Sequence, residues 1–448
     1  MKFSGRIIQW YLLNKRDLPW RETKDPYAIW LSEVILQQTR VDQGLSYYHR
    51  FLMAFPKVKD LADAEEFEVM KLWQGLGYYS RARNLHSTAK SIVEKHGGVF
   101  PNRYEDIIAL KGIGPYTAAA IASFAFGLPF ATVDGNVYRI LSRIFGLEIP
   151  IDSTEGKKQF AELGNELLDN TQPGLFNQAM MELGALVCNP KKPQCNICPF
   201  KKDCKAKALD LIDVLPVKEK KVKVKERVFH YLVMSDEKSV VMKCRGAGDI
   251  WQGLFDFPVI EDMKPLNNAE LIKVVLEKGW VRGLEKGGGE ARNGGGGETR
   301  IGGENGGGGV TRNAGGGGAR GGGAETRNGG GGGTRNSGGG GARGDGGTRN
   351  AGENGGGGAS GGGARGDGGK HGVSEGGKGK RNGAEIKLTL LAGPIKHVLT
   401  HQHIQAYFYK VQLNNLIDIE PEWTKVQLKA VHELPIPRLI DKFLIAHF

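Results

Sequence analysis

The stretch that decides the fold runs from Leu110 to Arg139 and reads LKGIGPYTAAAIASFAFGLPFATVDGNVYR. It begins with a glycine turn, Gly112 to Gly114, whose glycines allow positive φ and leave backbone N–H groups uncovered. Pro115 suits the first turn of a helix, and an Ala-rich helix is predicted over 117–125. Because an open helix N-terminus with bare N–H groups attracts phosphate, this turn predicts a backbone clamp on a DNA strand.

The second half of this stretch places a carboxylate downstream of the turn. Asp134 lies in the sequence VDGN, directly before an apolar helix predicted over 137–145. An aspartate at this position is commonly only an N-cap, and a lone G-x-G turn is commonly only a turn. The rest of the chain therefore decides between a structural and a functional interpretation.

Composition favours an anionic partner. The chain has 448 residues, 40% of them hydrophobic, and a formal net charge of +12. That length has room for about two to four domains, and the charge favours nucleic acid, although a merely basic protein is the alternative. We expect no transmembrane span and no signal peptide, because the first residues lack a long apolar core.

A second carboxylate is predicted on a helix over 29–41, with the sequence IWLSEVILQQTRV. Glu33 and Gln37 are four residues apart and therefore share one face of this helix. The apolar neighbours of Glu33 predict a half-buried carboxyl group, whereas a solvated glutamate is the alternative. Burial would raise its pKa toward the range of a general acid.

Aromatic and basic residues occur together in two other segments. Trp20 and Arg21 lie in a predicted extended loop, and residues 75–83, GLGYYSRAR, contain two tyrosines and two arginines. Rings interleaved with cations are typical of nucleic-acid binding, although a core tryptophan and a surface arginine are the simpler interpretation of the first segment. Helices are predicted throughout this part of the chain, to about residue 207.

Four of the five cysteines follow within 17 residues, spaced C-x6-C-x2-C-x5-C. Structural zinc usually uses two C-x2-C pairs, and only one is present here. The unequal arms favour a 4Fe-4S cluster, with zinc as the alternative. The predicted ligands are Cys188, Cys195, Cys198 and Cys204, whereas Cys244 is expected to be an ordinary buried cysteine.

The periodicity changes from helices to strands after a predicted linker over 208–227. Strands are predicted at 228–234, 239–243, 386–391 and 404–413, with a helix over 437–445, which indicates a mixed α+β domain over 228–448. Residues 287–383 contain most of the chain's 69 glycines and almost no apolar side chain. They are therefore predicted to be a disordered, low-complexity insertion in that domain.

The glycine turn, the helices carrying Glu33 and Asp134, and the four-cysteine loop together resemble the MutY family of adenine DNA glycosylases, in the helix-hairpin-helix superfamily. The resemblance covers residues 1 to about 280 and 386–448. It implies a mainly α helix-hairpin-helix glycosylase domain over 1–207 with an Fe–S loop. It also implies a C-terminal α+β Nudix-like domain for lesion recognition, without the glutamate-rich Nudix hydrolase signature.

The resemblance implies a role for each candidate site residue. Glu33 would protonate N7 of a flipped adenine, Asp134 would stabilise the oxocarbenium-like sugar, and Tyr116 and Asn136 would orient these carboxyl groups. Tyr116 stands where the lyases of the superfamily hold a Schiff-base lysine. The implied base-contacting and DNA-contacting residues are Trp20, Arg21, Gln37, Gln38, Thr39, Tyr78, Gly112, Gly114, Thr400 and His401.

The implied cofactor is a 4Fe-4S cluster, and the implied partner is double-stranded DNA with adenine opposite 8-oxoguanine or guanine. A monomer associated with DNA in the bacterial cytoplasm is expected, without a membrane partner. One alternative is an endonuclease III-like glycosylase and lyase for oxidised pyrimidines, which Tyr116 disfavours. The other is a non-catalytic Fe–S DNA-binding protein, which the presence of both Glu33 and Asp134 disfavours.

Overall fold

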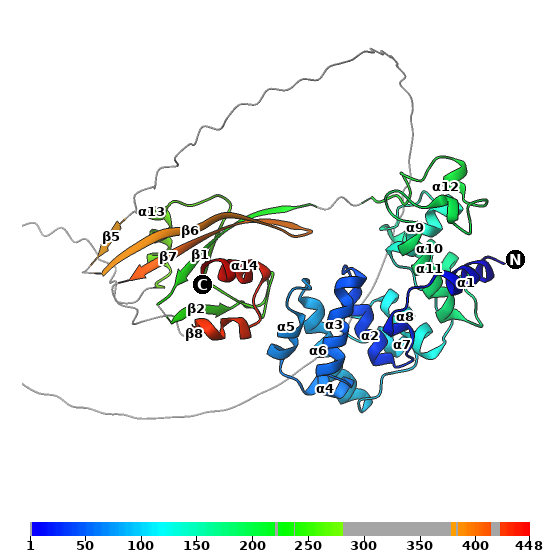
Figure 1. Ribbon diagram of the computed structural model, residues 1–448, viewed down its shortest axis with the longest axis horizontal. Coiled ribbons are helices and arrows are strands. Elements are labelled where there is room, and N and C mark those ends of the chain that lie inside the picture. Colours follow the sequence, from blue (N-terminus) through cyan, green and yellow to red (C-terminus); the bar gives the residue numbers. More distant parts are fainter. Residues whose placement is uncertain (1, 220–222, 237, 281–377, 382–383, 414–421) are drawn as a thin grey trace, which may run out of the picture. The chain divides into compact units, whose positions relative to one another are not determined.

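The computed structural model describes residues 2–219, 223–236, 238–280, 378–381, 384–413 and 422–448. Within these ranges, helices fill the chain up to residue 208 and strands begin at residue 225 (Figure 1). The predicted insertion over 287–383 lies outside the described residues except for 378–381. Those four residues form strand β5 (Lys378–Arg381), so the prediction of disorder is wrong there because their backbone pairs with β6.

The helical part contains twelve α-helices among the described residues. They are α1 (Phe3–Asn14), α2 (Pro26–Leu36), α3 (Val41–Ala54), α4 (Val58–Asp63), α5 (Glu66–Trp73), α6 (Ser80–His96), α7 (Tyr104–Ile108), α8 (Pro115–Phe126), α9 (Gly135–Phe145), α10 (Thr154–Leu167), α11 (Pro173–Leu186) and α12 (Lys205–Ala208). Short 3-10 helices occur at η1 (Pro19–Arg21) and η2 (Cys195–Ile197). The predicted helical periodicity is therefore confirmed.

Helix α2 begins and ends for identifiable reasons. The Asp25 side chain caps its N-terminus by accepting a hydrogen bond from the Tyr27 N–H. At the other end, the Arg81 guanidinium donates to the carbonyls of Val34 and Gln37, at 2.7 and 2.6 Å. Because this cation satisfies carbonyls that a helix end leaves open, α2 stops at Leu36 and does not continue to residue 41 as predicted.

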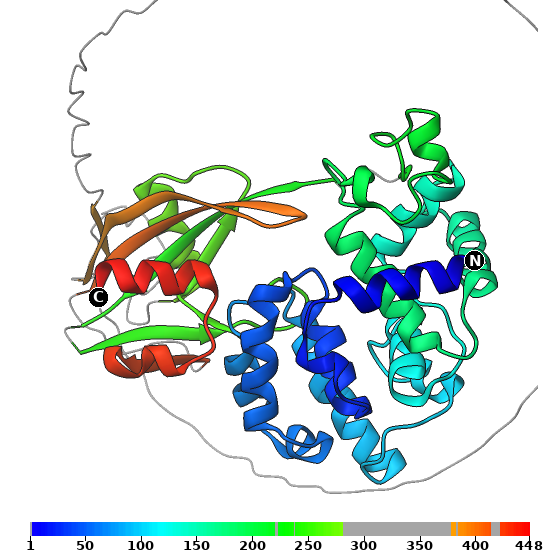
Figure 2. The ribbon, with the colours of Figure 1, turned by 45° about the vertical axis from the view of Figure 1, so that its right-hand side comes forward.

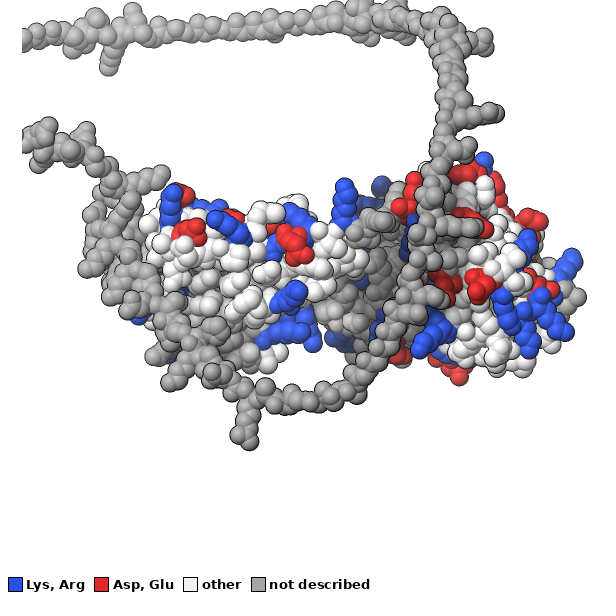
Figure 3. Space-filling model, turned by 90° about the horizontal axis from the view of Figure 1, so that it is seen from above, with Lys and Arg blue, Asp and Glu red and all other residues white. Residues whose placement is uncertain are grey.

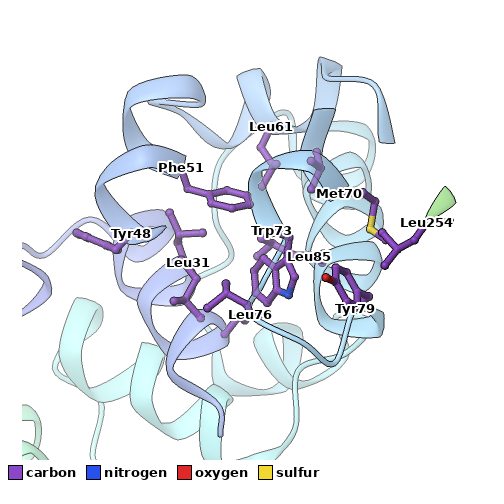
Figure 4. Close-up of a cluster of buried hydrophobic side chains, with 14 of the residues drawn as sticks. Leu31, Tyr48, Phe51, Leu61, Met70, Trp73, Leu76, Tyr79, Leu85 and Leu254 are labelled. Atoms are coloured by element: carbon purple, nitrogen blue, oxygen red, sulfur yellow. The ribbon is translucent and has the colours of Figure 1, made fainter. Parts of the chain in front are cut away.

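Buried apolar side chains of α2, α3, α4, α5 and α6 form the core beside the catalytic candidates. Figure 4 shows Leu31, Phe51, Leu61, Trp73 and Leu85 gathered between these helices, and all five are at most 1% exposed. A second apolar cluster joins α1, α9, α10 and α11, which lie together in Figure 2. Together these clusters give α2, α8, α9 and α11 fixed positions.

The strand-containing part has two sheets among the described residues. One has the order β4-β1-β7-β6-β5 and the other β3-β2-β8. The strands are β1 (Lys225–Met234), β2 (Ser239–Cys244), β3 (Phe255–Asp256), β4 (Val259–Asp262), β5, β6 (Ala384–Val398), β7 (Gln402–Leu413) and β8 (Trp423–Gln427). Central strand β1 pairs parallel with β7 and antiparallel with β4. A mixed α+β architecture is thus confirmed.

One helix packs on each face of the larger sheet. Leu232 of β1 packs in the same apolar cluster as Leu271 and Val275 of α13 (Asn268–Glu277). On the opposite face, the Phe408 ring of β7 stacks on Phe443 of α14 (Arg438–His447), with ring centroids 3.9 Å apart. Tyr231 of β1 stacks on the same Phe408 ring, so Leu232 and its neighbour Tyr231 lie on opposite faces of the sheet, as the two-residue period of a strand requires.

Cys244, expected to be buried, is exposed, because it is the last residue of β2 and lies beyond the buried residues in the middle of that strand. No helix among the described residues is long and apolar enough to cross a membrane.

Candidate active site

A cavity of about 660 Å³ lies in the helical part between η1, α2, α8, α9 and α11. Ten of the residues predicted from the sequence line it, although they are up to 116 positions apart in the chain. They are Trp20, Arg21, Glu33, Gln37, Gln38, Thr39, Gly114, Tyr116, Asp134 and Asn136. The fold thus brings together two carboxyl groups from different helices in one concave site.

Glu33 projects from α2 into this cavity and is only 5% exposed. The Tyr116 hydroxyl, on the first turn of α8, donates a hydrogen bond of 2.5 Å to Glu33 Oε2. Burial raises the pKa of Glu33 to about 7, an effect that Asp134 reinforces and that Tyr116 and Arg21 oppose. Burial also raises the pKa of Tyr116 well above its usual value, so its hydroxyl stays a donor. Glu33 can therefore carry a proton near neutral pH.

Asp134 is the N-cap of α9 and a member of the cavity at the same time. Its Oδ1 accepts hydrogen bonds from the N–H groups of Asn136 and Val137, at 2.9 and 2.8 Å. Its Oδ2 accepts a third, 2.7 Å long, from the Asn136 side-chain amide. Burial raises the pKa of Asp134, and these three donors oppose that rise by stabilising the carboxylate. The capping role and a chemical role are compatible, because the N-cap geometry fixes the carboxylate.

Asn136 is itself held by a buried arginine. Arg139 Nη2 donates to Asn136 Oδ1 over 2.8 Å, and Arg139 Nε donates to the Cys188 carbonyl over 2.7 Å. A continuous chain of hydrogen bonds therefore runs from Asp134 to the start of the cysteine loop.

Helix α11 supplies lining residues that the sequence did not reveal. Gln178, Met181, Glu182 and Ala185 line the cavity, and their spacing places them on one helical face. Glu182 is 1% exposed and binds the guanidinium groups of Arg16 and Arg21. The sequence signal for Gln178 and Glu182 is only that they are polar and four residues apart in a mostly apolar helix.

The glycine turn differs at its two ends. Gly112 has φ +77°, and a Cβ there would meet the Asn84 side chain at 2.8 Å, so only glycine fits. Gly114 has φ −94° and caps α8, and its Cβ position is open space. Positive φ is thus required at Gly112 alone, whereas Gly114 leaves room for another molecule beside the helix N-terminus.

Four predicted contact residues lie outside the cavity: Tyr78, Gly112, Thr400 and His401. Tyr78 has φ +48° and is partly exposed, and its hydroxyl is hydrogen-bonded to that of Thr400. Thr400 and His401 are exposed in the turn between β6 and β7. The Arg81 guanidinium, by contrast, donates to backbone carbonyls at the end of α2, so its role is structural.

The four-cysteine loop lies beside α9 and α11. All four predicted ligand cysteines line one small cavity with Arg143, although no group of three or more His, Cys, Asp or Glu side chains in the described part of the chain is arranged as a metal site. Arg143 Nη1 lies 3.5 Å from Cys188 Sγ, and the Phe200 N–H lies 3.4 Å from Cys198 Sγ. Four sulfur atoms with N–H donors around them are a donor set suited to an Fe–S cluster.

Figure 3 shows how charged side chains are distributed on one face of the molecule. On the face of the molecule in Figure 3, Lys and Arg are interspersed with Asp and Glu. On this face the net positive charge is therefore not gathered into one binding surface, and the cavity geometry carries more information.

Comparisons with known proteins identify relatives of this chain. Residues 31–167 match the HhH-GPD superfamily of base excision DNA repair proteins. An adenine DNA glycosylase of Buchnera aphidicola (subsp. Acyrthosiphon pisum) is 37% identical over 257 residues, which is 57% of this chain and 73% of that protein. The human adenine DNA glycosylase is 45% identical over 214 residues, 46% of this chain and 39% of that protein. Among solved structures, a thermostable thymine-DNA glycosylase superposes with a TM-score of 0.44 at 30% identity, over 46% of this chain and 95% of that one.

Proposed function

The chain belongs to the adenine DNA glycosylase family of base excision repair, and we propose that it is a monofunctional member that removes adenine opposite 8-oxoguanine or guanine. The observation that carries this proposal is the pair Glu33 and Asp134 in one cavity whose described lining contains no lysine. A lyase that works through a Schiff base needs an amine. Tyr116 supplies a hydroxyl there, and Lys111 lines a different groove.

Glu33 is the proposed general acid. The adenine must leave the duplex to reach the cavity, because its glycosidic bond is inaccessible in the base stack. Tyr116 occupies Glu33 Oε2, so Glu33 Oε1 is the oxygen that would meet the base. Protonation of adenine N7 makes the base a better leaving group, and a pKa of about 7 keeps a large fraction of Glu33 protonated near neutral pH.

Asp134 is the proposed counter-charge for the sugar. The C–N bond breaks with build-up of positive charge on the deoxyribose, as in other glycoside hydrolyses, where one carboxyl group acts as acid and the other as carboxylate. The donors from Asn136 and Val137 favour the ionised form of Asp134. Two carboxyl groups in different environments thereby take different protonation states.

The remaining cavity residues form the proposed base pocket. Trp20, 8% exposed, offers an aromatic surface against which a flipped base can pack. Arg21 and Thr39 supply donors in the same wall, and Gln37 Nε2 lies 3.3 Å from Thr117 Oγ1. The mixture of one aromatic face and few polar groups is typical of sites that bind a planar heterocycle.

DNA contacts are proposed at the edges of the cavity. The open N-terminus of α8 at Gly112 and Gly114 would bind a backbone phosphate. Gln38 and Tyr78 would fill the gap beside the base opposite adenine, and Thr400 and His401 would read that base. The hydrogen bond between Tyr78 and Thr400 supports this grouping, because it places two of the four residues together.

We also propose that Cys188, Cys195, Cys198 and Cys204 hold a 4Fe-4S cluster. Their common cavity and the N–H groups directed at two of the sulfur atoms fit this group better than a two-pair zinc knuckle. When bound, the cluster would cross-link a loop with little regular structure. Hydrogen bonds from Arg139 and Arg143 of α9 to the Cys188 and Asn189 carbonyls already connect that loop to α9.

The strand-containing part is proposed to be a Nudix-like domain that recognises the lesion and has no hydrolase activity. Its mixed sheet, with one helix on each face, supports this proposal. The glutamate cluster of Nudix hydrolases is missing from the sequence of α13. A DNA-associated monomer in the bacterial cytoplasm completes the proposal. The location is supported by cysteines that form no disulfide among the described residues.

The test is single-turnover cleavage of a labelled duplex with adenine opposite 8-oxoguanine, followed with and without hot alkali. A thymine-glycol duplex is the control substrate. Strand breaks at the adenine site only after alkali are expected, because base release without a Schiff base leaves the backbone intact. Breaks without alkali, or activity only on thymine glycol, would favour the endonuclease III-like alternative. Binding without any product would favour a non-catalytic protein.

A further inference from the structure

Glu182 is a buried carboxylate in the cavity wall to which the mechanism above gives no role. It accepts hydrogen bonds from the Arg16 backbone N–H and Nε, both 2.9 Å, and from Arg16 Nη2 at 2.7 Å. It also accepts from Arg21 Nη1 and Nη2, at 3.1 and 2.7 Å. Five donors on two oxygens leave no free lone pair for a base in the pocket. Glu182 therefore does not touch the substrate.

Arg21 is fixed by these contacts and by its other neighbours. Its side chain is 9% exposed, and Nη1 donates a further hydrogen bond of 2.9 Å to the Arg16 carbonyl. The guanidinium lies 5.5 Å from the centre of the Tyr11 ring. The Tyr11 hydroxyl in turn donates to Gln178 Oε1 over 2.8 Å. Arg21 thus has one position in the wall, and Glu182 is its only carboxylate partner among the described residues.

We propose that Glu182 is a positioning residue that holds Arg21 in the pocket wall and offsets its charge, so that Glu33 remains a proton donor at neutral pH. This inference rests on the proposed role of Glu33. The hydrogen bonds from both arginines outweigh burial and lower the pKa of Glu182 to about 2, so it stays ionised throughout the working range.

The charge balance gives the direction of the effect. Arg16, Arg21 and Glu182 together carry one net positive charge, and Arg21 lowers the pKa of Glu33. The other groups facing Glu33 are Tyr116 and Asp134, with Arg139 behind Asp134. Without the charge of Glu182 the wall would carry two positive charges, and Glu33 would lose its proton at lower pH.

The experiment is the pH profile of single-turnover adenine release for the full chain. In Glu182→Gln the upper limb of the profile should move down by about one pH unit, because the negative charge that offsets Arg16 and Arg21 is lost and the pKa of Glu33 falls. In Arg21→Gln it should move up, and in the double variant it should return toward the wild-type position. Glu182→Asp, which keeps the charge, should retain the wild-type limb even if its rate is lower.

The control is Asp256→Asn, which breaks another buried carboxylate–arginine pair, Asp256 with Arg245, in the strand-containing part. Its limb should stay in place. A lower rate in Glu182→Gln with an unmoved limb would mean a merely structural role and would overturn the proposal. If the Glu182 variants do not fold, Arg21→Gln decides alone, and an unmoved limb there overturns it equally. Failure of the proposed function is distinct, because the wild-type protein would then release no adenine.

Discussion

The Tyr116 hydroxyl donates a hydrogen bond to Glu33 Oε2 across 2.5 Å, inside the cavity that also contains Asp134. Tyr116 is at the first turn of α8, directly after the glycine turn, and Glu33 is on α2. The glycine turn proposed to bind a DNA strand is therefore directly followed by the residue that orients Glu33, the proposed acid.

Tyr116→Phe tests this relationship. The hydrogen bond from the Tyr116 hydroxyl lowers the pKa of Glu33, so removing the hydroxyl should raise that pKa. The upper limb of the pH profile of adenine release should then move to higher pH. The maximal rate should fall by roughly 2- to 10-fold, the equivalent of one neutral hydrogen bond. Single-turnover adenine release at several pH values measures both effects. A limb that moves to lower pH would contradict the assignment.

The two glycines of the turn should respond differently to alanine. Gly112→Ala should lower the free energy of unfolding by about 1–3 kcal/mol, because φ is +77° and the Asn84 side chain lies 2.8 Å from the new Cβ. Gly114→Ala, the matched variant, should cost at most about 1 kcal/mol of stability but should weaken binding of a duplex. Urea denaturation and fluorescence anisotropy measure these quantities. Equal stability losses in the two variants would be the contrary result.

Substitution of a cysteine in the loop should cause loss of iron, whereas substitution of Cys244 should not. Cys198→Ser should reduce iron content and the visible absorption of the purified protein, because Cys198 lines the cavity shared by all four loop cysteines. Cys244→Ser should change neither, since Cys244 is exposed on β2. Metal analysis of both variants beside the wild type gives the answer. Zinc in place of iron in the wild type would correct the proposed cofactor.

Substitutions in the turn between β6 and β7 should change the preference for the base opposite adenine and should leave adenine release itself intact. His401→Ala should reduce the ratio of adenine release opposite 8-oxoguanine to release opposite guanine, by about 1–3 kcal/mol in discrimination. His403→Ala is the control, because His403 pairs with Glu226 at 2.8 Å. Competition between the two duplexes measures the ratio. An unchanged ratio in His401→Ala would remove this residue from lesion recognition.

Much of the fold was predictable because its signals are local. The helical periodicity and the change to strands are confirmed, although β1 begins at Lys225, inside the linker predicted over 208–227. Pro115 and Asp134 lie at helix starts as predicted. The early end of α2 was not predictable, because it depends on Arg81, a cation more than forty residues away. Strand β5 was missed for a similar reason, since its pairing with β6 is not encoded in its own composition.

The site was predictable only in part. Glu33, Tyr116 and Asp134 follow motifs, and the structure brings all three into one cavity. Gln178 and Glu182 have no motif of their own, and their position depends on how α11 packs against distant segments. Nothing in the surrounding sequence of Glu182 indicates that its partners are Arg16 and Arg21.

The central claim is that Glu33 delivers the proton that releases adenine. The most direct measurement is the single-turnover rate of adenine release from pH 5 to pH 9 for the wild type and for Glu33→Gln. Because the acid form of Glu33 is needed and its pKa is about 7, the wild-type rate should fall tenfold per pH unit above that value. Glu33→Gln should be slower by about 10²–10⁴-fold and should lack this limb. A Glu33→Gln variant with the wild-type rate and the same limb would contradict the account.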